Sequence, residues 1–317
     1  MILKKDNLFI HPQGIGDLAI PLKFFIFNFI IKKNYKNDFI IQYKAQKKII
    51  ENYNKSKSQF FYSKIFYKLN LENFKKIKDL RKTQYKNIFI DPNINIFKAI
   101  LVTLILNSKN KIYKRFPFYK IFFNESPDYL KEKRKKYYEF LNKYVLNNNS
   151  ILEISSKKTK KIIYGVAPGT GNLEKHKRWP WQNFVKLINN TKHKPDEVYL
   201  FGVEKNILNL MSEQIIFKCK IINYKNINKS FDKLLMLKLL ITNDNGIANF
   251  ASIYGIKCYI ISGPNIPYSL NSFDNTKIIS KKLSCSPCYE TKRYGCGNPV
   301  CLTNFNNFEV SELIRDI

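Results

Sequence analysis

Four short segments of the sequence combine glycine with polar side chains that could bind a phosphorylated ligand. They are residues 14–17 (GIGD), 168–171 (PGTG), 202–204 (GVE) and 243–246 (NDNG). Each follows a short apolar run and precedes a helical pattern, which is typical of a loop that joins a strand to a helix. In open parallel sheets such loops gather at the carboxyl ends of the strands, where ligands bind. These segments are therefore the candidate functional site.

The PGTG segment has the composition of a phosphate-binding loop. Its glycines leave backbone N–H groups accessible, Thr170 adds a hydroxyl, and the cations Lys175, Lys177 and Arg178 follow closely. Backbone N–H groups, a hydroxyl and cations are the donors that a diphosphate needs. The alternative is a flexible loop with incidental lysines in a Lys-rich chain.

Acidic side chains stand in the other three segments. Glu204 lies just past a strand end, where it could bind a ribose diol, or it could simply favour the first turn of a helix. Asp244 could accept hydrogen bonds from sugar hydroxyls, beside the free N–H groups of the helix that follows. Asp17 is either a functional carboxylate or an ordinary helix cap, and the spacing alone leaves both open.

The elements that position these loops alternate between strand and helix. In the second half, strands are expected at 161–167, 197–201, 215–222, 239–242 and 257–261, and helices from Pro180, after Gly202, and at 231–237 and 247–254. In the first half, strands are expected at 8–11, 38–42 and 87–91, with Lys-rich amphipathic segments such as 60–71 between them. This alternation predicts parallel α/β sheets with crossover helices.

The length of 317 residues favours two domains. The polar stretches at 147–150 and 155–159 read as loop, so we place the boundary there and predict domains 1–155 and 156–317. The charged run 131–136 is expected to be a solvated helix face.

The net charge of +31 suggests nucleic acid at first sight. Only six of the 55 basic residues are Arg, and the excess of Lys, Asn, Ile, Phe and Tyr is typical of AT-rich codons. Composition bias therefore explains the charge better than a nucleic-acid partner, although a positive surface still favours anionic lipid headgroups or phosphorylated sugars. No secretory signal or clean apolar run of about 18–20 residues is visible, so we expect a cytoplasmic protein, with peripheral contact at the inner face of the membrane.

The cysteines all lie after residue 218. Cys285, Cys288, Cys296 and Cys301 have the ligand type of a structural zinc site, but their spacings are loose for one. Free or structural thiols are the favoured interpretation, and zinc is the alternative.

Taken in order, these segments resemble glycosyltransferase family 9, the heptosyltransferases of lipopolysaccharide core assembly. The resemblance is strong over residues 160–310 and is confined to residues 8–22 in the first half. It rests on Gly16-Asp17, 167–170 (APGT), 177–180 (KRWP), 244–246 (DNG), Gly263-Pro264 and 285–288 (CSPC).

The resemblance implies a GT-B fold, with two Rossmann-like, doubly wound domains that face each other across a cleft. The N-terminal domain would bind the acceptor, a lipopolysaccharide-core or other lipid-linked glycan, and the C-terminal domain the nucleotide-sugar, with ADP-heptose expected. Transfer would invert the anomeric carbon without a catalytic metal or a separate cofactor.

The resemblance also implies roles for single residues. Asp17 matches the general base, Thr170 the hydroxyl of the phosphate loop, Lys177 the pyrophosphate-binding lysine and Glu204 the ribose-binding carboxylate. Asp244 matches the residue that contacts the donor sugar, and Asn245 and Gly246 would supply amides that face the phosphates.

Two departures from the family pattern concern the donor. Asn245 stands where the family has Thr or Ser, and Asn249 where it has His. They leave open a different nucleotide-hexose donor. A non-enzymatic nucleotide- or nucleic-acid-binding protein is a further alternative. The presence of Asp17, Lys177, Glu204 and Asp244 together argues against it, because a binding protein would not need the base.

Overall fold

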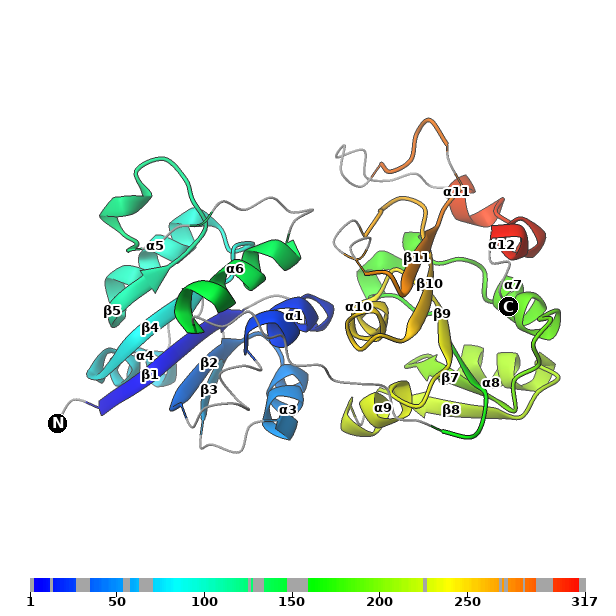
Figure 1. The fold of residues 1–317 in the computed structure, drawn as a ribbon, viewed down its shortest axis with the longest axis horizontal. Coiled ribbons are helices and arrows are strands. Elements are labelled where there is room, and N and C mark those ends of the chain that lie inside the picture. The colour runs from blue at the N-terminus through cyan, green and yellow to red at the C-terminus, as the bar shows by residue number, and fades with distance from the viewer. Residues whose placement is uncertain are drawn as a thin grey trace. The chain divides into compact units, whose positions relative to one another are not determined.

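The computed structural model shows two compact units, Met1–Leu152 and Glu153–Ile317. It describes all residues except 1–2, 12–13, 27–34, 54–57, 63–70, 125–126, 128–133, 147–158, 225–226, 268–269, 271–272, 282, 289–298 and 314–317. The loop in which we expected the domain boundary lies largely outside the described residues. Unit 1 and unit 2 are each an α/β layer structure (Figure 1).

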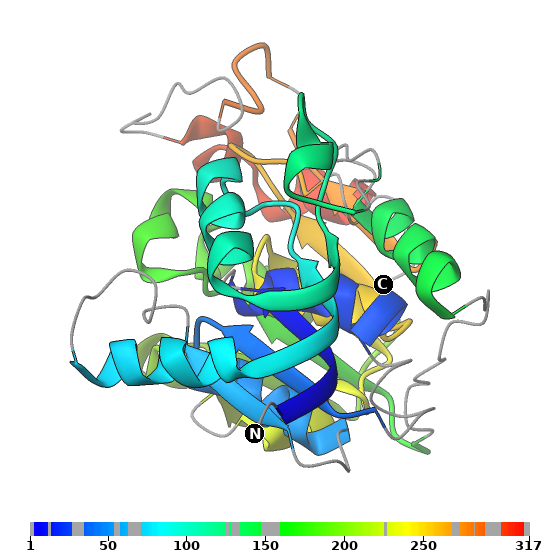
Figure 2. The same cartoon turned by 90° about the vertical axis from the view of Figure 1, so that its left-hand side faces the viewer.

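Unit 1 contains a parallel sheet in the order β3-β2-β1-β4-β5. α4 and α5 cover the face of the sheet that is turned toward the viewer in Figure 2. Among the other helices, α1 contacts α3 and α6. The strands are β1 (Leu3–His11), β2 (Asn37–Ile41), β3 (Gln59–Tyr62), β4 (Thr83–Ile90) and β5 (Asn107–Ile112). The helices are α1 (Ile15–Pro21), η1 (Leu22–Ile26), α3 (Lys44–Tyr53), α4 (Leu71–Lys82), α5 (Ile96–Ile105), η3 (Tyr119–Ile121) and α6 (Arg134–Leu146).

Two rows of like side chains cross this sheet and fix its register. Asn37, Asn7, Asn87 and Asn110 occupy paired positions on four neighbouring strands, and their amides form a chain of hydrogen bonds of 2.8–3.0 Å. Two residues further along lies a row of phenylalanine rings 5.2–5.3 Å apart, Phe60, Phe39, Phe9 and Phe89. A shift of one residue would bring the asparagines to the other face and leave their buried amides unpaired.

The amino ends of β1 and β2 hold a separate buried charge. Asp38 is fully buried and accepts hydrogen bonds from Lys5 Nζ at 2.7 Å, the Tyr85 hydroxyl at 2.8 Å and the Gln59 N–H at 2.9 Å. Burial and this carboxylate raise the pKa of Tyr85 well above its usual range. Because it lies at the opposite end from the strand-to-helix loops, we assign this network to stability.

Unit 2 contains a parallel sheet in the order β11-β10-β9-β6-β7-β8. Counted from β6, this is the strand order 3-2-1-4-5-6 of dinucleotide-binding folds. The strands are β6 (Ile163–Ala167), β7 (Glu197–Gly202), β8 (Cys219–Asn223), β9 (Leu239–Asn243), β10 (Lys257–Ile261) and β11 (Thr276–Ile279). The helices are η5 (Asn172–Lys177), α7 (Trp181–Asn189), α8 (Lys205–Gln214), α9 (Ile227–Leu234), α10 (Gly246–Ile253), α11 (Val300–Thr303) and α12 (Asn307–Leu313).

The strands that the sequence did not predict are β3, β5 and β11, and each is an edge strand of its sheet. The amphipathic segment expected at 60–71 therefore begins as part of β3, and residues 63–70 are outside the described part. β5 has the sequence NSKNKI, without an apolar run, because an edge strand is paired on one side only. Among the described residues, no helix combines the length and the apolar composition needed to cross a bilayer.

Candidate functional site

The candidate site of unit 2 lies where β6 and β9 are neighbours. The crossover connections that follow these two strands run to opposite faces of the sheet. A ligand can therefore bind between the two loops, at the carboxyl ends of the strands. Buried side chains tie the two loops together. Thr242 Oγ1 donates to the Ala167 carbonyl at 3.0 Å, and Asn243 Nδ2 donates to the Pro168 carbonyl at 2.6 Å.

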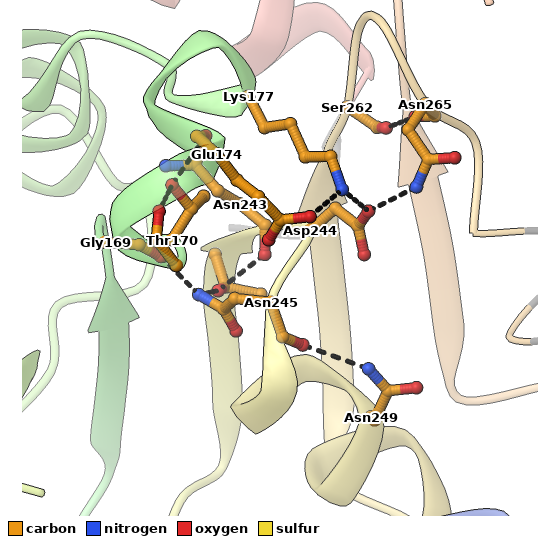
Figure 3. A network of polar contacts seen from close by, with 12 residues as sticks. Gly169, Thr170, Glu174, Lys177, Asn243, Asp244, Asn245, Asn249, Ser262 and Asn265 are labelled. Carbon is orange, nitrogen blue, oxygen red and sulfur yellow. Dashed lines mark hydrogen bonds and ion pairs between the residues drawn. The ribbon is translucent and has the colours of Figure 1, made fainter. Parts of the chain in front are cut away.

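Asn245 is the side chain that joins these loops most extensively (Figure 3). It caps α10, accepting from the N–H groups of Ile247 and Ala248 at 3.1 Å each, and its Nδ2 donates to the Gly169 carbonyl at 2.7 Å. Asn249 Nδ2 in turn donates to the Asn245 carbonyl at 3.0 Å. A Ser or Thr could cap the helix but has no NH₂ group for the second loop. The two departures from the family pattern thus have a structural use here.

Lys177 stands at the centre of the site, at the end of η5. Its Nζ lies 2.6 Å from Glu174 Oε1 and 3.8 Å from Asp244 Oδ2, and its side chain is 8% exposed. Asp244 Oδ2 also accepts from Asn265 Nδ2 at 2.5 Å, and Ser262 donates to the Asn265 carbonyl. Loops that follow β6, β9 and β10 therefore converge on one cation and one carboxylate (Figure 3).

Arg178 connects the predicted phosphate loop with the predicted ribose-binding residue. Its Nε donates to Thr170 Oγ1 at 3.0 Å, and its Nη1 lies 2.9 Å and 3.0 Å from the two carboxylate oxygens of Glu204. Glu204 occupies the N-cap position of α8 but makes no side-chain cap. Its carboxylate is therefore held by Arg178, a contact that the sequence analysis did not foresee.

The tryptophan of the KRWP segment anchors this part of the chain in the core. Trp179 is buried, its N–H donates to Asn243 Oδ1 at 3.0 Å, and its indole N–H donates to the Phe305 carbonyl. Its ring meets Phe184 of α7 edge-on, with centroids 4.8 Å apart. Trp179 therefore packs the start of α7, and it holds the adjacent Lys177 and Arg178 in place.

Asp17 lies in unit 1, in the first turn of α1. The N-cap of this helix is Gly14, so Asp17 is not the capping residue. One Asp17 carboxylate oxygen lies 3.2 Å from the position that a Cβ on residue 14 would take, so a side chain there would require this carboxylate to shift slightly. The buried Gln46 amide donates to the Gly14 carbonyl at 3.5 Å and accepts from the N–H groups of Gln42 and Tyr43.

A buried His–Asp pair at the ends of β1 and β4 was missed by the sequence analysis. His11 Nδ1 lies 2.6 Å from Asp91 Oδ2, both residues are 4% exposed, and the Tyr138 hydroxyl donates to the same carboxylate oxygen at 2.8 Å. The signal was weak, because each residue is a single polar position at a strand end, 80 residues apart in sequence. The pair nevertheless occupies the same topological position in unit 1 as the loops around Lys177 do in unit 2.

The cysteine cluster is only partly described, because Cys296 lies in the segment 289–298. Cys285 is exposed, Cys288 is half-buried, and Cys301 is buried in α11 against Gly263. Within the described ranges, no three His, Cys, Asp or Glu side chains are grouped as metal ligands.

Comparisons with known proteins agree with this architecture. Residues 119–295 match glycosyltransferase family 9 (heptosyltransferase). Lipooligosaccharide heptosyltransferase 2 of Campylobacter jejuni serotype O:6 is 27% identical over 169 residues, 50% of this chain and 52% of that protein. The serotype O:2 enzyme is 27% identical over 139 residues, 41% of this chain and 43% of its own. The chain thus spans about half the length of these curated relatives.

Two solved structures share the fold over nearly the whole chain. E. coli ADP-heptose lps heptosyltransferase II superposes with a TM-score of 0.65 at 15% identity, covering 98% of this chain and 97% of the other. E. coli heptosyltransferase WaaC with ADP-2-deoxy-2-fluoro heptose gives a TM-score of 0.72 at 13% identity, covering 98% and 99%. The expectation of two Rossmann-like units of the GT-B class is confirmed. The chain belongs to glycosyltransferase family 9, the heptosyltransferases.

Proposed function

We propose that this chain transfers a sugar, heptose from ADP-heptose, to a lipopolysaccharide-core or other lipid-linked glycan. The observation that supports this most directly is the convergence of three strand-end loops on Lys177 and Asp244 in unit 2. Structures of a relative with the same fold contain ADP and ADP-2-deoxy-2-fluoro heptose. The site would be on the cytoplasmic side of the inner membrane, where activated sugars are made.

The donor diphosphate would bind Lys177 in place of Glu174. A buried ammonium group needs a counter-charge, and Glu174 supplies it while no donor is bound. Glu174 is the partner that can leave, because its side chain is 37% exposed, whereas that of Asp244 is 13% exposed and held by Asn265. Asp244 would then remain to accept a hydroxyl of the donor sugar.

Thr170 and Glu204 would bind the phosphate and the ribose of the same donor. Arg178 already sets their separation by holding the hydroxyl of one and the carboxylate of the other. The N–H groups of Asn245 and Gly246, at the start of α10, would face the phosphates. In this arrangement Lys177 and the helix terminus stabilise the charge that develops on the leaving diphosphate, and no metal is required.

Asp17 would act as the general base of unit 1. Its carboxylate would accept the proton of the acceptor hydroxyl while that oxygen bonds to the anomeric carbon and the bond from this carbon to the diphosphate breaks. Attack from the face opposite the leaving group inverts the anomeric centre. Support comes from the match of Gly16-Asp17 to the family motif and from the finding that Asp17 is not the helix cap.

A second candidate donor is another nucleotide-hexose. It is favoured because the side-chain NH₂ groups of Asn245 and Asn249 both donate hydrogen bonds to backbone carbonyls. They differ from the Thr or Ser and the His of the family, so the contacts to the sugar would differ too.

Calorimetric titration with a panel of nucleotide sugars tests the proposal. We expect ADP-heptose and ADP to bind and only the donor to be turned over with an acceptor glycan. Binding of a UDP- or GDP-hexose in preference to ADP compounds would select the second candidate. If no nucleotide diphosphate binds, the assignment of unit 2 is wrong.

A further inference from the structure

The four most exposed large apolar side chains of the described part of unit 1 lie on α5 and on the segment that follows β5. Phe97 is 81% exposed, Leu104 is 70% exposed and Leu101 is 49% exposed, all on α5. Phe118, at the N-cap position of η3, is 81% exposed, and Ile121, within η3, is 73% exposed. These five side chains define what we call the α5 surface. Exposure of this much apolar area to water is unfavourable, and such a surface is typical of a site that binds an apolar partner.

The two segments form one structural piece. Inward-facing residues of both, such as Ala99 and Val102 of α5 and Tyr113 and Phe123 beside η3, belong to a single core cluster. Lys111 Nζ also donates to the Thr103 carbonyl at 2.7 Å. The five exposed side chains therefore belong to segments that share one core.

Phe118 is held in an unusual conformation on this surface. Its φ of 61° and ψ of 18° are left-handed, and it is the only non-glycine residue with positive φ in the described part of the chain. This conformation is costly for a bulky side chain, and glycine or asparagine normally occupies it. Core packing does not explain a phenylalanine there, because its ring is exposed.

The chain segment that carries the α5 surface is rich in cations. Residues 92–124 contain six cations and no Asp or Glu. Lys98, Lys109, Arg115 and Lys120 are exposed. A segment that pairs exposed aromatic and aliphatic side chains with cations alone complements a surface that is apolar inside and negative outside.

This charge pattern selects among the partners. A second copy of the chain would place the same cations opposite one another across a two-fold interface, which is repulsive. A nucleic acid would use the cations but would leave the aliphatic Leu101, Leu104 and Ile121 without a use. A bilayer that contains anionic lipids accommodates both kinds of side chain.

We propose that the α5 surface docks unit 1 on an anionic membrane. Phe97, Leu104, Phe118 and Ile121 enter the boundary between headgroups and acyl chains, and the surrounding cations contact the lipid phosphates. The inference extends the proposed function, since a lipid-linked acceptor would be reached from the bilayer surface. Its failure is distinguishable, because none of these residues lies in the nucleotide site of unit 2.

Vesicle flotation with the full chain tests this proposal. We expect binding to vesicles of phosphatidylcholine with phosphatidylglycerol, weaker binding to phosphatidylcholine alone, and loss of binding as salt rises. Replacement of Phe97 and Leu104 by Ser should reduce the affinity for anionic vesicles by at least about tenfold. The matched control is Ile216→Ser, which changes a 70% exposed side chain of unit 2 and should leave vesicle binding unchanged.

Phe118→Gly separates binding from folding. Glycine fits the left-handed conformation, so the melting temperature should be equal or higher while vesicle affinity falls about threefold or more. The proposal is overturned if wild type ignores anionic vesicles, or if the Phe97/Leu104 variant binds them like Ile216→Ser. It is also overturned if wild type is a dimer that this variant converts to monomer, or if the variant loses affinity for single-stranded nucleic acid and not for vesicles.

Discussion

The carboxyl ends of the two sheets have the same topology but different chemistry. In both units the first strand lies beside the fourth, so the carboxyl ends of these two strands are neighbours. In unit 2 these ends and their loops bring together Lys177, Glu174 and Asp244, a buried cation with two anionic partners. In unit 1 they bring together His11 and Asp91, which are buried against each other. Topology thus decides where a site can form, and the loop residues decide what it can bind.

The difference fits a division of labour between the two units. A nucleotide diphosphate has a fixed charge and shape, so its site needs contiguous motifs such as PGTG and KRWP. An acceptor glycan presents a hydroxyl whose proton must be removed, so the proposed site in unit 1 needs a base, for which Asp17 is the candidate. The predictions below test this division, beginning with the largest expected effect.

Asp17→Asn should lower kcat by about 10²- to 10⁴-fold, because the amide cannot accept the acceptor proton. The affinity for ADP should stay unchanged, because the donor site belongs to unit 2. Steady-state kinetics with ADP-heptose and calorimetry with ADP measure the two quantities. If the variant unfolds and its folded fraction keeps normal activity, Asp17 has a structural role only.

Lys177→Ala should lower kcat/KM by a factor that corresponds to about 2–4 kcal/mol of lost transition-state stabilisation. It should weaken ADP binding as well. The phosphates are contacted both before and during transfer, so KM and kcat should change together. Lys161→Ala, which removes the cation of a surface pair with Glu197, is the control and should change neither. Equal effects of the two variants would mean that Lys177 does not bind the diphosphate.

Asn245→Ala should destabilise unit 2 by about 2–3 kcal/mol, since it removes a helix cap and the bond to the Gly169 carbonyl. Thermal unfolding followed by tryptophan fluorescence reports on unit 2, because Trp179 and Trp181 both belong to it. Asn249→Ala removes only the bond to the Asn245 carbonyl and should cost about 1 kcal/mol or less. The reverse order would show that the Asn245 side chain does not hold the two loops together.

Glu174→Gln should tighten ADP binding about three- to tenfold, because the neutral amide no longer competes with the diphosphate for Lys177. Binding of AMP should tighten less, because AMP carries only one phosphate, so that the preference for ADP increases. Calorimetry with both nucleotides measures the change. Weaker binding of both would indicate that Glu174 contacts the nucleotide directly.

The sequence predicted the central strands and the loops of unit 2 well, because buried strands are apolar runs that end in glycine and polar residues. It missed the edge strands β3, β5 and β11, because β5 and β11 carry lysines and β3 begins a segment with an amphipathic pattern. It also could not show which side chains join the loops. Asn245 reaches a carbonyl 76 residues earlier in the chain, and Arg178 reaches a carboxylate 26 residues later. Such pairings depend on strand order, which local patterns do not contain.

The partnership of His11 with Asp91 was hidden for the same reason. Each is an unremarkable residue in its own segment, and only the pairing of β1 with β4 brings them within 2.6 Å. The roles given to the five site residues are proposals: Asp17, Thr170, Lys177, Glu204 and Asp244. The structure places the last four at the carboxyl ends of the strands of unit 2.

The central claim is that unit 2 binds a nucleotide diphosphate with its own cations and helix termini. Titration of the full chain with ADP in excess EDTA, measured by calorimetry for wild type and for Lys177→Ala, tests it most directly. We predict that wild type binds ADP in EDTA, and that the variant binds it at least about tenfold more weakly. Binding that disappears in EDTA and returns with Mg²⁺ would contradict the claim, as would equal affinity of the two proteins.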